Sequence, residues 1–157
     1  MPNKQQLITW VGATLRESAW APLSVVAIYL IGLAFHLYDL FPPLDVPTHF
    51  LGGVAITYLY RSAIKNSQSF AGDVPFGVQV LFAFTCTGTT TVLWEFYENI
   101  IDYVLGTHMV LGLTDTLKDM FLGLLGAAGE FGDNDGCEHA ENDEHEQQFH
   151  QGEAPAR

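Results

Sequence analysis

The chain has 157 residues, of which 48% are hydrophobic, 13% aromatic and 15% charged, and its formal net charge is −12. This length suits a single domain, and an apolar body whose few charges lie in short patches is typical of a small helical membrane protein. The acidic balance and the lack of a basic patch exclude nucleic acid as a partner. The sequence also has no Gly-rich phosphate loop, no His-Glu-x-x-His zinc helix and no Gly-x-Ser-x-Gly nucleophile elbow, so no motif decides whether the protein is an enzyme.

We predict an all-α fold in three parts. Residues 1–20 form an N-terminal interfacial helix, residues 21–131 form a polytopic bundle of about four transmembrane helices, and residues 132–157 form a disordered acidic tail. The tail is predicted from its charge, since nine acidic residues after Ala128 face only Arg157 and no apolar run is present. Such a segment cannot bury enough surface to offset the entropy of folding.

The N-terminal segment places four apolar residues on one face of a predicted helix over residues 4–20: Leu7, Ile8, Val11 and Leu15. This pattern suits a helix that lies at the membrane surface, and a helix packed on the bundle is an equally open interpretation. The apolar stretch that follows Trp20 is too long for the core of a usual signal peptide. We therefore interpret it as a retained first span.

Four apolar segments make up the predicted bundle, at residues 22–40, 46–64, 75–104 and 114–131. About 20 residues of helix, at about 1.5 Å per residue, cross the roughly 30 Å hydrocarbon core of a bilayer. The fourth segment is shorter, because the uncharged stretch between Asp119 and Glu130 amounts to about 15 Å of helix. It spans the membrane only if these two acids lie near opposite surfaces, and the alternative is a re-entrant or half-span helix.

Basic residues are distributed unequally between the two ends of these segments. One end carries Lys4, Arg16, Arg61 and Lys65, whereas Lys118 belongs to the other end. By the positive-inside bias, the N-terminus, the second connection and the tail face the cytoplasm of a bacterial inner membrane. This topology brings the end of the first segment, the start of the second, the end of the third and the start of the fourth together in the outer half.

Most acidic residues of the body fall in that outer half, where permanent positive charge is scarce. Carboxylates gathered in a low-dielectric place cannot all remain ionised, so protons or a divalent metal must intervene. Glu95 and Glu98 share one helix face, and the Asp45/His49 and Asp115/Asp119 pairs are each spaced i,i+4. We therefore predict a site for a divalent metal whose candidate ligands are His49, Glu95, Glu98 and Asp119, with Asp115 and Asp45 in support.

Structural roles are alternatives for several of these polar residues. Asp45 and Asp115 stand at predicted helix starts, where a helix N-cap is an equal interpretation. Asp39 and Asp102 fit solvated positions at the interface, and His36 fits a bond to a backbone carbonyl. The other candidate ligands lie inside apolar runs, where an ionisable side chain is costly and usually functional.

The surroundings of the cluster can also be predicted. Gly32, Gly52 and Gly123 each lie one helical turn deeper than a polar residue, which predicts close backbone contact beneath the site. On the third helix, Trp94 and Phe96 belong to an aromatic and apolar back behind the polar stripe.

Three strings, Asp45-Val-Pro-Thr-His49, Trp94-Glu95-Phe-Tyr-Glu98 and Asp115-Thr-Leu-Lys-Asp119, resemble the YjdF-like family of bacterial inner-membrane proteins. That family is in turn similar to the VanZ-like proteins associated with glycopeptide resistance. The resemblance implies a polytopic membrane protein and names no reaction. Beyond Ala128 the chain departs from the family pattern, because an acidic tail stands where more apolar sequence is expected. The motif residues that the resemblance implies are Asp45, His49, Glu95, Glu98, Asp115 and Asp119.

Three functional hypotheses follow from the cluster. The first is a metal-dependent membrane enzyme or metal-binding protein that acts on a lipid headgroup or a cell-envelope precursor. The second is a proton or cation transporter subunit, for which so small a bundle implies a homo-oligomer. The third is a non-catalytic structural or envelope-accessory protein, in which one ion or shared protons hold the bundle together.

Overall fold

The computed structural model describes residues 2–107 and 109–131, and within them all regular structure is helical. The predicted all-α class is therefore confirmed, whereas the predicted disorder of residues 132–157 lies outside the described residues. The helices occur in chain order as α1 (Lys4–Ser18), α2 (Trp20–Ala34), α3 (Leu37–Leu40), the 3-10 turn η1 (Pro42–Leu44), α4 (Asp45–Ala71), α5 (Phe76–Leu105) and a helix over residues 113–131. We refer to the last of these as the 113–131 helix.

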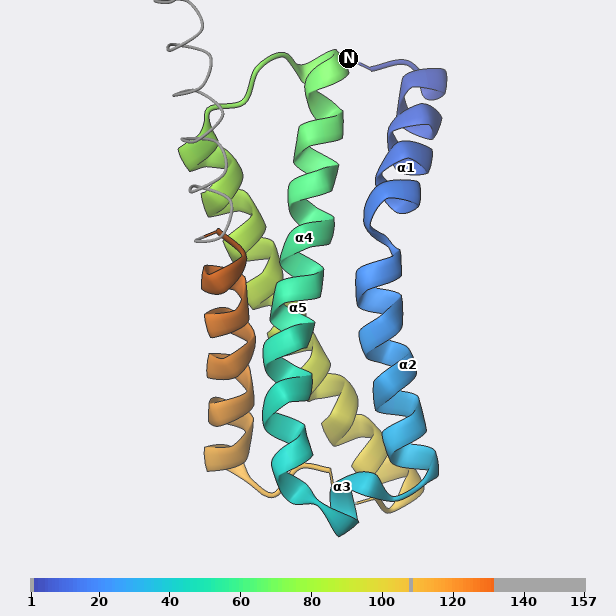
Figure 1. The fold of residues 1–157 in the computed structure, drawn as a ribbon, viewed down its shortest axis with the longest axis vertical. Coiled ribbons are helices and arrows are strands. Elements are labelled where there is room, and N and C mark those ends of the chain that lie inside the picture. The colour runs from blue at the N-terminus through green and yellow to red at the C-terminus, as the bar shows by residue number, and fades with distance from the viewer. Residues whose placement is uncertain (1, 108, 132–157) are drawn as a thin grey trace, which may run out of the picture.

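The long helices lie side by side and alternate in direction along the chain (Figure 1). Helix α2 runs down toward α3, α4 runs back up, α5 runs down again and the 113–131 helix returns upward. The end of α2, the start of α4, the end of α5 and the start of the 113–131 helix therefore meet at one end of the bundle, which we call the site end. The predicted convergence of the four segment ends is confirmed by this arrangement.

Helix α1 packs along the half of α4 that is remote from the site end. The α1 helix begins at a capping box in which Asn3 and Gln6 each accept the other's backbone N–H at 2.8 Å. Its Trp10 indole donates to the Ala63 carbonyl at 2.7 Å, and Asn66 donates to Glu17 at 3.0 Å. This contact matches the interpretation of a helix packed on the bundle.

The other face of α1 bears on the alternative interpretation, a helix at the membrane surface. The small polar residues Thr14 and Ser18 are buried toward the bundle. All four residues of the predicted apolar face point outward and are exposed: Leu7, Ile8, Val11 and Leu15. The α1 helix thus presents an apolar surface that a membrane interface would cover.

The predicted first segment, residues 22–40, is interrupted near its end. Helix α2 stops at Ala34, and His36 adopts a left-handed backbone conformation (φ 54°) before the short α3. A side chain in that conformation is uncommon and cannot continue an α-helix. The prediction of one continuous helix is therefore wrong here, because apolar composition continues through the break and gives no signal of it.

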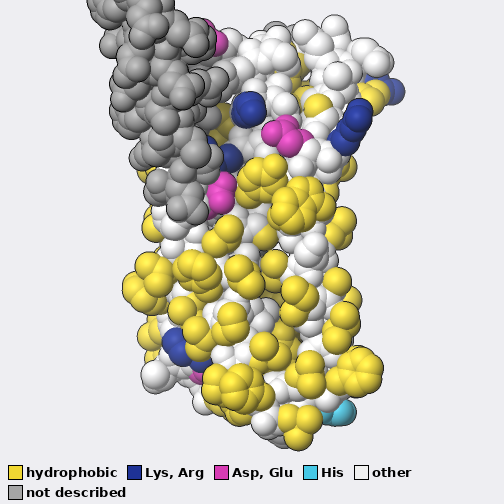
Figure 2. Space-filling view, in the orientation of Figure 1, with side chains coloured by type: hydrophobic (Ala, Val, Ile, Leu, Met, Phe, Trp, Pro, Cys, Tyr) yellow, Lys and Arg dark blue, Asp and Glu magenta, His cyan; other side chains and the backbone are white. Residues whose placement is uncertain are grey.

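Small polar side chains share the interior of the bundle with apolar residues such as Ile64, Ala83 and Phe131. The largest fully buried side chains among the described residues are Thr57, Thr87 and Ser18, whereas large apolar side chains are exposed along every long helix. On the face shown in Figure 2, hydrophobic side chains form a broad band and charged side chains gather toward its two ends. Exposed apolar surface on this scale is typical of a face that a membrane or another apolar partner covers.

The number of spans is a separate question from the number of helices. Within the described residues, α5 alone is long and apolar enough to cross a membrane, and α1 with α2 qualifies as a second span if the pair, bent by 56°, is counted as one. The prediction of about four spans is thus not confirmed.

Glycines let the 113–131 helix approach α4 very closely. A Cβ added at Gly53 would overlap the carbonyl oxygen of Gly123, and one added at Gly126 would overlap that of Phe50. The prediction of close backbone contact is confirmed at Gly123. It is wrong at Gly52, where the neighbouring Gly53 makes the contact instead, and at Gly32, where an added Cβ would meet the Tyr38 side chain. Close backbone contact here sets the distance between the polar residues one turn nearer the site end.

Candidate metal centre

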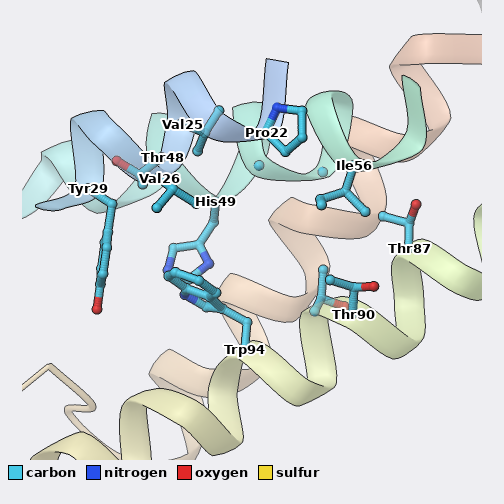
Figure 3. Close-up of a pocket in the computed structure, with 13 residues that line it drawn as sticks. Pro22, Val25, Val26, Tyr29, Thr48, His49, Ile56, Thr87, Thr90 and Trp94 are labelled. Carbon is cyan, nitrogen blue, oxygen red and sulfur yellow. The ribbon is translucent and has the colours of Figure 1, made fainter. Parts of the chain in front are cut away.

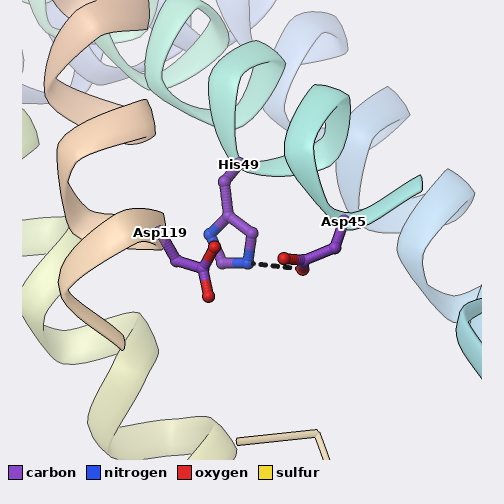
Figure 4. Close-up of side chains that lie close together, drawn as sticks. All are labelled: Asp45, His49 and Asp119. Atoms are coloured by element: carbon purple, nitrogen blue, oxygen red, sulfur yellow. Dashed lines mark ion pairs between the residues drawn. The ribbon is translucent and has the colours of Figure 1, made fainter. Parts of the chain in front are cut away.

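His49 stands between two sets of carboxylates at the site end. Its side chain is 10% exposed, with Nε2 3.1 Å from Asp45 Oδ1 and Nδ1 3.9 Å from Glu95 Oε1. The contact with Asp45 follows from the first turns of α4, in which residues four apart share a face. Figure 4 shows Asp119 of the 113–131 helix approaching the same imidazole.

The α5 helix contributes two buried carboxylates. Glu95 and Glu98 are only 5% and 6% exposed, while Phe96 on the opposite face is 61% exposed. The predicted polar stripe therefore faces the interior, and its apolar back faces outward. The Trp94 indole N–H donates to Glu98 Oε1 at 2.9 Å, and Thr116 lies within hydrogen-bonding reach of Glu95.

Lys118 contacts a second set of carboxylates. Its Nζ lies 3.0 Å from Asp45 Oδ2, 2.7 Å from Asp115 Oδ1 and 3.3 Å from Asp119 Oδ1. Asp119 is 4% exposed, and within the described residues its Oδ1 accepts no well-aligned hydrogen bond despite the nearby ammonium. A single lysine thus lies within ion-pair distance of three carboxylates.

Two groups of potential ligand atoms result, and both include His49. The first is Asp45, His49 and Asp119, and the second is His49, Glu95 and Glu98; in each, one ligand atom per residue lies within 4.8 Å of the others. All six predicted site residues are therefore brought to one place, since Asp115 is linked to the first group through Lys118.

Two acids and a histidine at the same end do not join these groups. His36 and Asp39 form a pair at 3.1 Å with side chains 79% and 74% exposed, so the interpretation of Asp39 as a solvated residue fits. Asp102 instead organises the connection to the 113–131 helix, because its carboxylate accepts the backbone N–H groups of Met109 and Val110, each at 2.9 Å.

The N-cap interpretation is wrong for both aspartates to which it applies. The N-cap of α4 is Leu44, and no side chain caps that helix, so Asp45 is free to bind Lys118 and His49. Asp115 lies inside the 113–131 helix, where its Oδ2 accepts from the backbone N–H of Leu111 at 3.2 Å. Capping therefore does not account for Asp45, whereas Asp115 binds a backbone N–H that directly precedes its helix without being the N-cap.

The sequence does not predict two contacts of the site in full, those of Trp94 and of Lys118. Trp94 was assigned to the apolar back of α5, yet its indole binds Glu98; the spacing of four residues was an available signal. Lys118 contacts three acids, which its position in the sequence does not indicate. The contact with Asp45 depends on how closely the 113–131 helix approaches α4, which sequence spacing does not reveal.

Comparison with known proteins places this chain among membrane proteins. Residues 13–129, which include every predicted site residue, match the family described as "Predicted membrane protein (DUF2238)". No curated protein and no solved structure gives a match. The finer resemblance to YjdF-like and VanZ-like proteins stays a prediction, as do the inner membrane and the orientation of the termini. Because the match covers most of the chain, the protein belongs to the DUF2238 family of predicted membrane proteins.

Proposed function

We propose that this membrane protein binds one divalent metal ion between His49, Glu95 and Glu98. The observation that carries the proposal is the position of the His49 ring, whose two nitrogens face different carboxylates. Asp45 lies on one side of the ring and Glu95 on the other. A single imidazole so placed can bind an ion with one nitrogen while the other nitrogen is held in position.

The protonation of the ring supports this assignment. In the neutral imidazole, the nitrogen 3.1 Å from a carboxylate oxygen, Nε2, is the one that would carry the proton, which leaves a lone pair on Nδ1. The 3.9 Å between Nδ1 and Glu95 Oε1 is too long for a hydrogen bond. Two ligands that bind one ion at about 2.1 Å lie roughly 3 to 4 Å apart, so this spacing suits a shared metal. Asp45 then orients a metal-binding histidine, as carboxylates commonly do.

The distribution of charge favours the same three residues. Lys118 contacts Asp45, Asp115 and Asp119 and offsets one of their negative charges, whereas Glu95 and Glu98 are buried and form no ion pair with it. Two buried carboxylates need a compensating cation or a proton. One nitrogen and two carboxylate oxygens suit Zn²⁺, Mn²⁺ or Fe²⁺, and three protein ligands leave a position open for water or substrate.

The chemistry that a bound metal supplies is polarisation of a phosphoryl or carbonyl oxygen and activation of water. Because the site lies at one end of an apolar band, we propose a lipid headgroup or an envelope precursor as the molecule acted on. Cation or proton transport by the same carboxylates is the alternative. Flux into liposomes that disappears in Glu98→Gln would favour that alternative.

Metal content of the purified protein tests the proposal directly. After equilibration with Zn²⁺, Mn²⁺ or Fe²⁺ and removal of free metal, elemental analysis should find about one ion per chain, and Glu98→Gln should lose it. The matched control is Asp39→Asn, an exposed acid at the same end, which should keep the metal. A parent protein that takes up no metal and whose thermal stability does not respond to these ions would sink the proposal.

A further inference from the structure

A cavity of about 110 Å³ lies beside the candidate metal centre, between α2 and α5. Both helices pack along α4 and make little direct contact with each other, so α4 forms the floor of the cavity. Its walls include Pro22, Val25 and Val26 of α2 and Gly52 and Ile56 of α4. Figure 3 shows His49 and Trp94 toward one end of the cavity and Ile56 and Thr87 toward the other.

The α5 wall looks polar in sequence but offers no spare hydrogen-bond donor. Thr90 and Thr91 each donate to a backbone carbonyl of the preceding turn, at 2.9 and 2.8 Å. Thr57 donates to a backbone carbonyl, so the 2.8 Å bond between Thr57 and Thr87 uses the hydroxyl hydrogen of Thr87. With these donors engaged, the cavity suits an apolar occupant better than water or a hydrated ion.

Aromatic rings close the cavity at the site end. The Tyr29 and Trp94 rings meet edge to face with centroids 4.9 Å apart. Their polar atoms point to other partners, since Trp94 donates to Glu98 and Tyr29 donates to the sulfur of Met109 at 3.1 Å. His49 also lines the cavity, so an occupant would lie against the imidazole of the candidate metal centre.

The cavity opens toward the exposed apolar surface of α2. Val26 lines it and is nevertheless 38% exposed, and its neighbours Leu23 and Leu30 on α2 are more exposed still. We propose that a segment of one acyl chain of a bilayer phospholipid enters sideways between α2 and α5 and occupies this cavity. The proposal rests on the shape and the lining of the cavity and stands independently of the metal.

Quenching of tryptophan fluorescence by brominated lipids tests this occupancy. The chain has three tryptophans, so Trp10→Phe with Trp20→Phe leaves Trp94, at the cavity wall, as the single reporter. The protein is reconstituted into phosphatidylcholine vesicles with or without bromine on the acyl chains. We expect strong quenching of Trp94 that falls by at least half when Gly52→Leu fills the cavity.

Gly52 is suited to this test because an added Cβ meets only Val25, at 4.0 Å. The control is Gly77→Leu, at a position with nothing within 4 Å and away from the cavity, which should leave the quenching unchanged. If Gly52→Leu lowers stability, Val25→Phe fills the same space from the α2 wall. Quenching that is equal in the parent and in the cavity-filling variants would overturn the proposal.

Metal content measured on the same samples keeps the two proposals apart. If the protein binds metal but quenching of Trp94 is the same in the parent and in the cavity-filling variants, only the acyl-chain site is contradicted. Quenching that depends on the cavity in a protein that takes up no metal contradicts only the proposed metal centre.

Discussion

At the scale of single residues, Lys118 determines which carboxylates need a further cation. It lies within 3.3 Å of oxygens from Asp45, Asp115 and Asp119, and it does not reach the two glutamates of α5. Its single positive charge offsets part of the negative charge of these three aspartates and none of the charge of the two glutamates. Two predictions at this scale separate the groups.

The first prediction concerns Asp45, which orients His49 in the proposed site and does not bind the metal. Asp45→Asn should weaken metal affinity by about 10- to 100-fold, the usual cost of losing a residue that positions a metal-binding histidine. Glu98→Gln should abolish stoichiometric binding. Competition with a chelating dye measures both affinities. The reverse order, with Asp45→Asn abolishing binding and Glu98→Gln retaining it, would place the metal in the Asp45–His49–Asp119 group.

The second prediction concerns Lys118 itself. Lys118→Met removes the cation that serves three carboxylates, one of them buried, and should destabilise the protein by about 1–3 kcal/mol. Thermal unfolding in detergent with a chelator present measures the loss, and added divalent metal should restore part of it. Lys65→Met is the control, because Lys65 is 75% exposed and lies 3.9 Å from Glu17 at the far end. An unchanged melting temperature in Lys118→Met would show that this lysine is dispensable.

At the scale of elements, the crossing of α4 and the 113–131 helix brings Asp119 to His49. The two backbones touch through Gly53, Gly123 and Gly126, so the polar residues one turn away lie close enough to interact. Small residues at such crossings are the usual means by which membrane helices approach each other.

A third prediction tests this crossing. Gly53→Ala forces the two helices apart and should lower stability by about 1–3 kcal/mol, as overpacking does, and should weaken metal binding with it. The control is Gly12→Ala on α1, where an added Cβ meets nothing within 4 Å. Because alanine has a higher helix propensity than glycine, this variant should be as stable as the parent or slightly more stable. Thermal unfolding of both variants gives the comparison. Equal melting temperatures for Gly53→Ala and the parent would mean that the helices do not cross here.

At the same scale, the helices were largely predictable. The segments 46–64, 75–104 and 114–131 correspond to α4, α5 and the 113–131 helix, because long apolar runs between turn residues are a strong helix signal. The boundaries were less predictable. Helix α4 continues through residues 65–71 as a polar helix packed on α1, where a connection was predicted.

At the scale of the whole molecule, charge and apolar surface are separated along the bundle axis. The apolar band in Figure 2 is flanked by charged ends, and helices α4 and α5, with 27 and 30 residues, are each long enough to cross it. At about 1.5 Å per residue they extend roughly 40 and 45 Å, which exceeds a hydrocarbon core of about 30 Å.

A fourth prediction concerns the topology of the chain. Asp73, in the connection between α4 and α5, and Leu111, in the connection before the 113–131 helix, lie at opposite ends of α5 and are both exposed. Reporter fusions at these two positions should therefore report opposite sides of the membrane, with Asp73 on the cytoplasmic side. Signals from the same side at both positions would show that α5 does not span.

The sequence by itself determined the helical class, the apolar composition and the end of the bundle to which each polar residue belongs. These properties follow from local periodicity and from the alternation of helix direction along the chain. Only the tertiary structure decided which atoms meet: that His49 faces Asp45 with one nitrogen and Glu95 with the other, and that Lys118 serves three carboxylates. Contacts between side chains of different helices depend on the distance between the helix backbones and on the rotation of each helix about its axis. Glycines at the helix crossing set that distance, and residue spacing within a single helix does not encode it.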